Sequence, residues 1–514
     1  MPANIRPTRG LGDAPTPPGV PIVRILFGLI PFLMAQCFLA QPIPAADPEN
    51  PNSQISPSTI DPGQFGFSPE ATGIANTRAL QQAFDLGGQI TVSRPGTYRV
   101  AGTAYIGSDT AIRFAPGVVL RKEAEAGPFS HVILNKGART RTYDHNIAID
   151  GLQIIVNKVD ARTFKDAYGL HGQLALFYVQ DAKISRFRCL DLGPAQYGIQ
   201  VCTFQDLHIQ DVIIKGLKDG VHLGRGSRFT IRDGVFETFD DAIALNAHDY
   251  STGNPELGWI ENGVIENCHD LAAEKTTGFF CRILAGAWID WRAGMEVQQS
   301  DTVVADGRMY RVQAKADGTL YTSQTKPTHL TGSAKLDGIT WGMVQTDVTY
   351  TAGVRNVVFR DIFLEKNRTS FSVHFDIGKY SRSYYPGAQI PHQENLVFDH
   401  IQSLHGTGEP LSFLFNIATP VDGISVVNSR IGNDQIRFVT NKAMTDYGPT
   451  KINFVGCTFT HAGPLDLVVN QVPGKVIALK TSSSLEMSPG FSAQVKPGEG
   501  TITVDSDLTG LKKP

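Results

Sequence analysis

Short strand-like segments that recur at a nearly regular interval are the feature that most constrains the fold of this sequence. Each segment alternates apolar and polar residues over three or four positions and is followed by small or polar turn residues. In the segments 207–210 and 229–232, the matching residues Ile209 and Ile231 are 22 positions apart. Segments of the same kind begin at Ile147, Lys183, Val264, Asn356, Asn395, Gly423 and Lys451.

A period in the twenties indicates units that stack on one another, because a single short unit cannot bury its own apolar face. The alternation favours strands over helices, and a coil of parallel strands accounts for the period better than a β-sandwich does. The 514 residues, 41% of them hydrophobic, are enough to fill a long core. We therefore predict an all-β fold, a right-handed parallel β-helix, with a short N-terminal capping helix and a small β insertion.

The N-terminal part of the chain has the pattern of an export signal. An apolar run at residues 25–40 follows Arg24, and the small residues Ala45 and Ala46 come shortly after it. This pattern predicts a signal peptide over residues 1–46 and a secreted or periplasmic protein, with a retained membrane anchor as the alternative. Residues 47–72, rich in Pro, Ser and Asn, are predicted to form a linker.

The remaining chain divides into four predicted regions. Residues 73–287 form the N-terminal part of the β-helix and open with a short helix capped by Asn76 or Thr77. Asp-Gly turns replace the regular rhythm in residues 288–350, which predicts a small β insertion with an aromatic core. Residues 351–473 resume the coil, and residues 474–514 form a C-terminal tail with no assigned role.

Two acidic stretches, Lys218-Asp219-Gly220-Val221-His222 and Phe239-Asp240-Asp241, lie one predicted coil apart. Asp219 and Asp241 are separated by 22 residues, so we expect them on neighbouring rungs, about 4.8 Å apart. If Val221 points into the core, Asp219 shares its inward side and His222 points outward. Asp219 can then reach the surface only at a bend, which Gly220 permits. We expect the three aspartates to converge on one outer face.

Three crowded carboxyl groups supply the protonation states that hydrolysis of a glycosidic bond needs. One protonated carboxyl gives its proton to the leaving oxygen, and an ionised carboxylate activates a water molecule. Mutual repulsion raises the pKa of one carboxyl and leaves the pKa of another low. The structural alternative is that the aspartates cap turns of the coil and are exposed to solvent.

The same stretches resemble a known family. Lys218-Asp219-Gly220-Val221 is similar to the Asn-Thr-Asp-Gly element of polygalacturonases, pectin hydrolases of the pectate lyase-like β-helix superfamily. Phe239-Asp240-Asp241 is similar to their Gly/Gln-Asp-Asp element. Cys281-Arg282-Ile283-Leu284 is similar to their Arg-Ile-Lys element, with Leu284 in place of the lysine, and their Gly-His-Gly element has no counterpart here. The resemblance covers residues 147–286 closely and the rest of the coil by its rhythm.

This resemblance implies a glycoside hydrolase that inverts the anomeric carbon of a uronate-containing polysaccharide or oligosaccharide. It implies that Asp241 is the general acid and that Asp219 and Asp240 activate water. It also implies that His222 and Arg282 orient the substrate or bind its carboxylate.

Three nearby residues, Lys218, His248 and Asp249, are further candidates for substrate binding. A His-Asp pair on a turn is more often incidental than functional. Basic residues around the acidic stretches are compatible with an acidic sugar or with ordinary solvated charges; they are Lys215, Lys218, Arg225, Arg228 and Arg282.

The overall charge argues against nucleic acid as the main partner, because the formal net charge is -3. The five cysteines beyond Cys37 are an odd number, which allows one or two disulfides but not complete pairing. Their spacing matches no metal site, so we expect neither a metal nor a cofactor. The oligomeric state is not predicted.

Two other functions stay open. Polysaccharide lyases and epimerases also use β-helices, and in such an enzyme Lys218, His222 or Arg282 would act as the base while the aspartates bind Ca²⁺. The third function is non-catalytic glycan binding by a secreted solenoid that resembles phage tailspikes.

Overall fold

The computed structural model describes residues 59–505, except 250–252, 274–275, 379–381, 405–411, 433, 440–449, 462, 482–485 and 488–491. The predicted signal peptide, membrane anchor and cleavage site, and residues 47–58 of the predicted linker, lie outside the described residues. Among the described helices, none combines the length and the apolar character that crossing a membrane requires.

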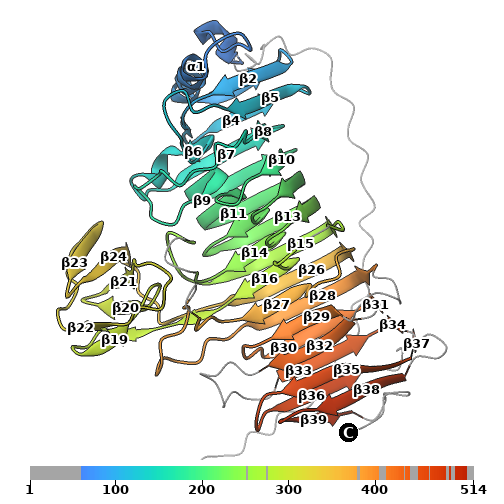
Figure 1. Cartoon of the computed structure of the whole chain (residues 1–514). Coiled ribbons are helices and arrows are strands. Elements are labelled where there is room, and N and C mark those ends of the chain that lie inside the picture. The colour runs from blue at the N-terminus through green and yellow to red at the C-terminus, as the bar shows by residue number, and fades with distance from the viewer. Residues whose placement is uncertain are drawn as a thin grey trace, which may run out of the picture. The chain divides into compact units, whose positions relative to one another are not determined.

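The described chain winds into a coil whose strands run parallel to their neighbours on the preceding and following turns (Figure 1). Each turn contributes strands to three faces, which we name A, B and C in chain order. Face A contains β1 (Gly88–Val92), β4 (Thr110–Phe114), β7 (Asp144–Asp150), part of each long strand β9 (Gly172–Ser185), β11 (Tyr197–Gly216), β13 (Gly226–Thr238), β15 (Ile260–Asp270), β26 (Val354–Leu364) and β28 (Glu394–Ser403), then β30 (Gly423–Val427), β33 (Thr450–Val455), β36 (Val476–Thr481) and β39 (Thr501–Val504).

Face B contains β2 (Gly96–Val100), β5 (Val118–Lys122), β8 (Gln153–Ile155), β10 (Arg188–Leu192), the later parts of β11, β13, β15, β26 and β28, and then β31 (Arg430–Gly432), β34 (Thr458–Thr460) and β37 (Glu486–Met487). Face C contains β3 (Ala104–Ile106), β6 (Ile133–Asn135), the first parts of β9 and β11, then β12 (Val221–Leu223), β14 (Ile243–Asn246), β16 (Cys281–Leu284), β27 (Phe371–His374), β29 (Ser412–Ile417), β32 (Asp434–Val439), β35 (Pro464–Gln471) and β38 (Ser492–Pro497). Alternate side chains fill one continuous core inside the coil. The predicted parallel β-helix is confirmed.

The long strands bend where residues adopt the left-handed backbone conformation. Asp206, Arg228 and Asn262 occupy one such position on three successive turns, with φ of 56, 57 and 59°. Asn and Asp tolerate this conformation better than most residues. Side chains link the bends from turn to turn, since Arg228 Nε donates to Asp206 Oδ1 over 2.6 Å.

The interval between matching residues varies along the coil. It is 22 residues from Asp206 to Arg228, 34 from Asp233 to Asn267, and 39 from Asn356 to Asn395. It rises to 94 from Asn262 to Asn356 because the insertion lies in that turn. The strands keep their register, and the connections between them absorb the differences in length.

The N-terminal helix α1 spans Gly73–Leu86. Its N-cap is Thr72, whose hydroxyl accepts a hydrogen bond from the Ala75 N–H, so the predicted caps Asn76 and Thr77 are wrong. Asn76 is buried within the helix and exchanges two hydrogen bonds with the backbone of Ser68. The side chains of Leu80 and Phe84 are buried in the core at the first turn of the coil.

The ordered coil extends past both predicted boundaries. Before α1, the 3-10 helix η1 (Pro62–Phe65) lies in the predicted linker, and Ile60 pairs with Ile90 of β1. A second 3-10 helix, η2 (Lys136–Ala138), follows β6. At the other end, strands β36 to β39 continue the parallel pairing beyond residue 473, in the predicted tail.

The insertion forms sheets of its own outside the coil (Figure 1). One sheet contains β18 (Ile289–Asp290), β20 (Thr302–Ala305), β21 (Arg308–Val312), β24 (Ile339–Gln345) and β23 (Ser333–Leu336), and a second pairs β19 (Met295–Val297) with β22 (Tyr321–Ser323). At its base, β17 (Gly286–Ala287) pairs antiparallel with β25 (Thr351–Ala352). Trp288, Tyr310 and Trp341 are fully buried, whereas Trp291 and Tyr321 are half-buried.

Candidate active site

Asp219, Asp240 and Asp241 form an acidic cluster at the corner between faces B and C. One carboxyl oxygen of each residue lies within 4.8 Å of the others. Asp219 stands just before β12 and Asp241 just before β14, and these strands pair with Val221 opposite Ile243. The 22-residue separation in the sequence therefore corresponds to one turn of the coil.

Glycines allow the backbone to pass closely at this corner. A Cβ atom on Gly220 would lie 2.6 Å from the carbonyl oxygen of Ala242, and one on Gly278 would lie 2.2 Å from the carbonyl carbon of Asp240. Asp219 and Asp241 are 4% and 3% exposed, while the side chain of Asp240 is 29% exposed. Asp240 is thus the solvent-accessible member, and the other two lie beneath it.

The three carboxyl groups differ in their pKa values. Burial, followed by the charges of Asp219 and Asp240, raises the pKa of Asp241 well above its usual value. Burial and the charge of Asp219 also raise the pKa of Asp240. Burial opposes ionisation of Asp219, but Lys218 and the hydrogen bond with His222 outweigh it and lower the pKa of Asp219. Burial and crowding therefore shift the pKa of Asp241 upward, while Lys218 and His222 shift the pKa of Asp219 downward.

Hydrogen bonds fix the cluster from several directions. The Phe279 N–H donates to Asp241 Oδ1 over 2.8 Å. Lys218 Nζ contacts the Asp240 carboxylate directly and lies 3.7 Å from Asp219 Oδ1. Asp219 Oδ1 is buried and has no hydrogen-bond partner among the described residues. This oxygen is left to accept from a water molecule or a ligand.

His222 points outward from face C, as predicted, but it is completely covered. Its Nδ1 lies 2.8 Å from Asp219 Oδ2, and its Nε2 lies 3.1 Å from Asn254 Oδ1. Its ring stacks on Tyr197 with centroids 4.1 Å apart. Because no part of His222 is exposed, the expected substrate contact is corrected: His222 positions Asp219.

His248 and Asp249 are also buried, which corrects their expected role in substrate binding. His248 Nε2 lies 3.1 Å from the Thr302 hydroxyl of the insertion. Asp249 Oδ2 accepts a hydrogen bond from Asn246 and lies 3.7 Å from His222 Nε2. His248 therefore helps to pack the insertion against face C, and Asp249 lies between His222 and Arg282.

A contact chain joins the insertion to the cluster. Arg311 Nη2 donates to the Asn254 carbonyl over 2.6 Å, and the Asn254 side chain donates to the Asn246 carbonyl over 2.6 Å. Asn254 then contacts His222, which contacts Asp219. Sequence reasoning missed Asn254 because it lies in a connection without strand periodicity.

Arg282 lies on face C one turn beyond β14, and its side chain is 16% exposed. Its Nη2 lies 2.6 Å from Asp376 Oδ2, and its Nη1 lies 3.6 Å from Asp249 Oδ1. Burial opposes its charge, but Asp376 and Asp249 raise the pKa of Arg282 further above its usual value. Asp376 was missed, as was His374, whose Nε2 lies 3.4 Å from Arg282 Nε. The one feature that could have pointed to them is β27, which ends at His374 and pairs with β16, the strand that contains Arg282.

The other basic residues named above do not join the cluster. Lys215 pairs with Glu237, Arg228 with Asp206, and Arg225 with Asp347. Of the basic residues named from the sequence, Lys218 and Arg282 are therefore the two at the site, and Arg368 also reaches it, because its Nη1 donates to the Asp240 carbonyl over 3.3 Å. The three carboxyl oxygens are also spaced so that one divalent cation can contact them, since hard cations prefer oxygen ligands.

No protein-family model and no curated protein matches the chain. Among solved structures, it is similar to a family 28 exopolygalacturonase from Yersinia enterocolitica, at 15% identity and a TM-score of 0.44 over 88% of this chain and 79% of the other. It is also similar to a tailspike protein of E. coli bacteriophage HK620, at 9% identity and a TM-score of 0.43 over 88% and 78% of the two chains. A third similar structure is the catalytic unit of an α-1,3-glucanase from Streptomyces thermodiastaticus, at 11% identity and a TM-score of 0.36 over 89% and 69%. Similarity at this level concerns the coiled fold and does not extend to substrate or residue roles.

Proposed function

We propose that this protein is a glycoside hydrolase in which Asp241 is the general acid and Asp219 and Asp240 activate water. The main support for the proposal is that two carboxyl groups of one cluster have pKa values shifted in opposite directions: that of Asp241 is raised and that of Asp219 is lowered. The raised pKa favours the protonated form of Asp241, and the lowered pKa favours the ionised form of Asp219. Both states are needed at once for acid–base hydrolysis.

In the proposed reaction, Asp241 gives its proton to the glycosidic oxygen as the bond from that oxygen to the anomeric carbon breaks. A water oxygen bonds to the anomeric carbon, and Asp219 or Asp240 takes the water proton. Asp240 is the most exposed of the three carboxyl groups, and Asp241 and Asp219 keep 3% and 4% exposure, whereas His222, His248 and Asp249 have none. Lys218 contributes to keeping the base carboxylates ionised.

The stereochemical course is open to a direct test. The sequence resemblance implies inversion, but the carboxyl oxygens lie closer than the roughly 6.5–9.5 Å typical of inverting enzymes. Proton NMR of the first-formed anomer distinguishes the two courses. Inversion supports a single displacement by water, whereas retention would make Asp219 or Asp240 the nucleophile.

For the substrate, we propose a glycan that contains uronate residues, contacted through Arg282 and Lys218. Both cations lie at the cluster and are partly exposed. An Arg guanidinium can bind a carboxylate at two points, which here requires the substrate carboxylate to displace Asp376 from Arg282. The test is incubation with acidic and neutral polysaccharides while reducing ends and the ultraviolet absorbance of unsaturated uronates are measured together. New reducing ends without absorbance support the hydrolase. If no polysaccharide yields new reducing ends, the hydrolase proposal is wrong and non-catalytic glycan binding becomes the favoured function.

A lyase is the second candidate, because the spacing of the carboxyl oxygens also suits Ca²⁺. Of its three expected bases, Lys218 is partly exposed at the cluster, and the other two are poorly suited. His222 is fully buried, and Arg282 has a raised pKa. Rising absorbance that depends on added Ca²⁺ would favour the lyase over the hydrolase.

We also propose that the protein is secreted or periplasmic. The support is the apolar run at residues 25–40 with small residues after it. N-terminal sequencing of the exported protein tests this, and a start near residue 47 is expected.

A further inference from the structure

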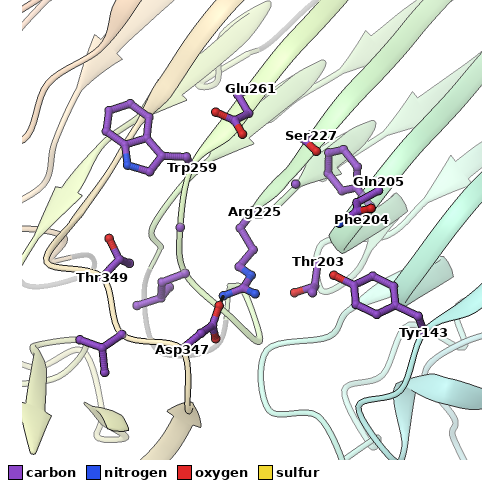
Figure 2. A pocket seen from close by; sticks show the side chains of 14 residues that line it. Tyr143, Thr203, Phe204, Gln205, Arg225, Ser227, Trp259, Glu261, Asp347 and Thr349 are labelled. Carbon is purple, nitrogen blue, oxygen red and sulfur yellow. Dashed lines mark ion pairs between the residues drawn. The ribbon is translucent and has the colours of Figure 1, made fainter. Parts of the chain in front are cut away.

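A pocket of about 260 Å³ lies at the corner between faces C and A, and Figure 2 shows the residues that line it. None of the three aspartates of the acidic cluster lines this pocket. The short strand β12 separates the two places: Asp219 precedes it, and Arg225 follows it and lines the pocket. One wall comes from three successive turns of the coil, and the other comes from Tyr143 and residues 347–349 at the end of the insertion.

The coil wall presents polar groups in a regular row. Gln205, Ser227 and Glu261 occupy the same position on successive turns, so they follow one another at about 4.8 Å. Beside this row, the Phe204 ring lies over Gly226, where a Cβ atom would be only 2.4 Å from Phe204 Cδ1. The pocket therefore combines an apolar floor with hydrogen-bonding groups along one side.

Aromatic side chains stand on both sides of the pocket. Figure 2 shows Trp259 and Tyr143 at opposite edges, with Arg225 between them. The Trp259 indole is held by the Arg355 guanidinium, 4.6 Å from the ring centroid, and by the His392 ring at 5.3 Å. Trp and Tyr offer an apolar ring together with a polar tip, which suits the apolar C–H groups and hydroxyl edge of a sugar.

The charges in the pocket are already compensated. Arg225 Nη1 lies 2.6 Å from Asp347, and Arg225 Nε lies 3.4 Å from the buried Glu256. Glu261 pairs with Arg355 over 2.6 Å. A carboxylate ligand would have to displace one of these partners, so the pocket favours an uncharged ligand.

We propose that this pocket is a second, non-catalytic binding site for a neutral sugar residue of a glycan. The insertion supplies one wall through residues 347–349, which gives it a function beyond its own fold. Hydroxyl groups of the sugar bond to the row of Gln205, Ser227 and Glu261, and a ring face packs on Trp259. The proposal rests on the pocket alone and does not require hydrolysis at the acidic cluster.

The test is isothermal titration calorimetry of the whole mature protein carrying Asp241→Asn, so that no probe is consumed if the cluster is hydrolytic. The probes are cellotriose, maltotriose, mannotriose, galactotriose and trigalacturonate. We expect at least one neutral trisaccharide to bind, and Trp259→Ala to weaken that binding about tenfold. The proposal is overturned if no neutral probe binds, or if Trp259→Ala leaves the affinity within twofold.

Because Trp259 also packs on Arg355 and His392, a second variant separates binding from folding. Ser227→Tyr fills the pocket from the coil wall and is expected to abolish neutral binding while the melting temperature stays close to that of the parent. The matched control is Trp291→Ala, which removes a half-buried tryptophan of the insertion outside the pocket. Equal loss in the Trp291 and Trp259 variants would overturn the assignment. Turnover at the acidic cluster is assayed separately, so the two proposals fail independently.

Discussion

Two buried charge clusters lie on neighbouring turns of the coil, and they differ in how their charges are balanced. In the acidic cluster, three carboxyl groups lie together, and Lys218 contacts the Asp240 carboxylate and lies 3.7 Å from Asp219 Oδ1. In the second cluster, Asp270 lies between Lys366 and Arg368. Lys366 Nζ is 2.9 Å from Asp270 Oδ1, and the Arg368 guanidinium reaches both carboxylate oxygens at 2.9 to 3.2 Å.

The comparison shows that burial alone does not identify a reactive carboxyl group. The Asp270 side chain is as buried as Asp241, but both of its oxygens are occupied by cationic donors. The acidic cluster has excess negative charge, split pKa values and an oxygen of Asp219 without a hydrogen-bond partner among the described residues. The Asp270 carboxylate, with both oxygens bonded to cationic donors, therefore serves the structure. The acidic cluster, with more carboxyl groups than cations, is the candidate for chemistry.

The strongest test removes one carboxylate from each cluster. Asp241→Asn is expected to lower kcat on the polysaccharide that the wild type cleaves by about 10² to 10⁴, because the general acid is lost. Asp270→Asn is expected to lower kcat per folded molecule far less, because Asp270 reaches the site only through Lys366 and Arg368, which donate to the backbone carbonyls of Thr238 and Asp240. Release of reducing ends, normalised to the folded fraction by circular dichroism, measures both. Near-normal turnover in Asp241→Asn would contradict the inference that the acidic cluster is catalytic and the Asp270 cluster structural.

The same pair of variants should differ in the opposite sense in stability. Asp270→Asn leaves Lys366 and Arg368 buried without their carboxylate, so we expect a loss of about 3–5 kcal/mol in unfolding free energy. Denaturation by guanidinium chloride, followed by circular dichroism, gives the midpoint. An unchanged midpoint would show that water can replace the Asp270 carboxylate, and it would contradict the structural role inferred for that cluster.

Asp241 should make the folded protein less stable as the pH rises. Its pKa is raised in the folded state and lies near 3.9 when unfolded, so between these values only the folded state holds the proton. Unfolding free energy then falls by up to about 1.4 kcal/mol per pH unit in this window. Asp219 affects stability in a different pH range. Because its pKa is lowered in the folded state, it stabilises the fold above about pH 3.9, and this stabilisation is lost as the pH falls toward the folded-state pKa.

Asp241→Asn removes the titrating proton and should therefore be more stable than the wild type at pH 7. The advantage should shrink toward pH 4. Denaturation midpoints of both proteins at pH 4, 5, 6 and 7 measure it, with Asp466→Asn as the control for a partly exposed aspartate elsewhere on the coil. A constant difference across this range would mean that Asp241 is ionised in the folded protein.

The sequence predicted what depends on periodicity. Alternation specified the coil, and the 22-residue separation specified that Asp219 and Asp241 lie on adjacent turns, because strand register repeats from turn to turn. The position of His222 outside the coil also followed from strand parity. Its burial did not, because residues 246–249 and 253–258 and the insertion cover that face, and neither part has a repeating pattern.

Contacts between residues that are far apart in the sequence could not be predicted either. Asp376 reaches Arg282 across 94 residues, and Arg311 reaches Asn254 across 57. The α1 cap was misplaced because Asn76, a good capping residue, is instead used to bond the Ser68 backbone. In each case a tertiary contact decided what the local pattern left open.

The smallest expected effect concerns the contact chain from Asn254 through His222 to Asp219. Asn254→Ala removes the partner of His222 Nε2, and losing one hydrogen bond of about 1 kcal/mol should lower kcat about fivefold with little change in KM. A less firmly held His222 also weakens its bond to Asp219, so the pKa of Asp219 rises and the acidic limb of the pH–rate profile moves to higher pH. Asn453→Ala, on β33 of face A, is the matched control. A lower kcat with an unshifted acidic limb would mean that Asn254 supports the fold and not the base.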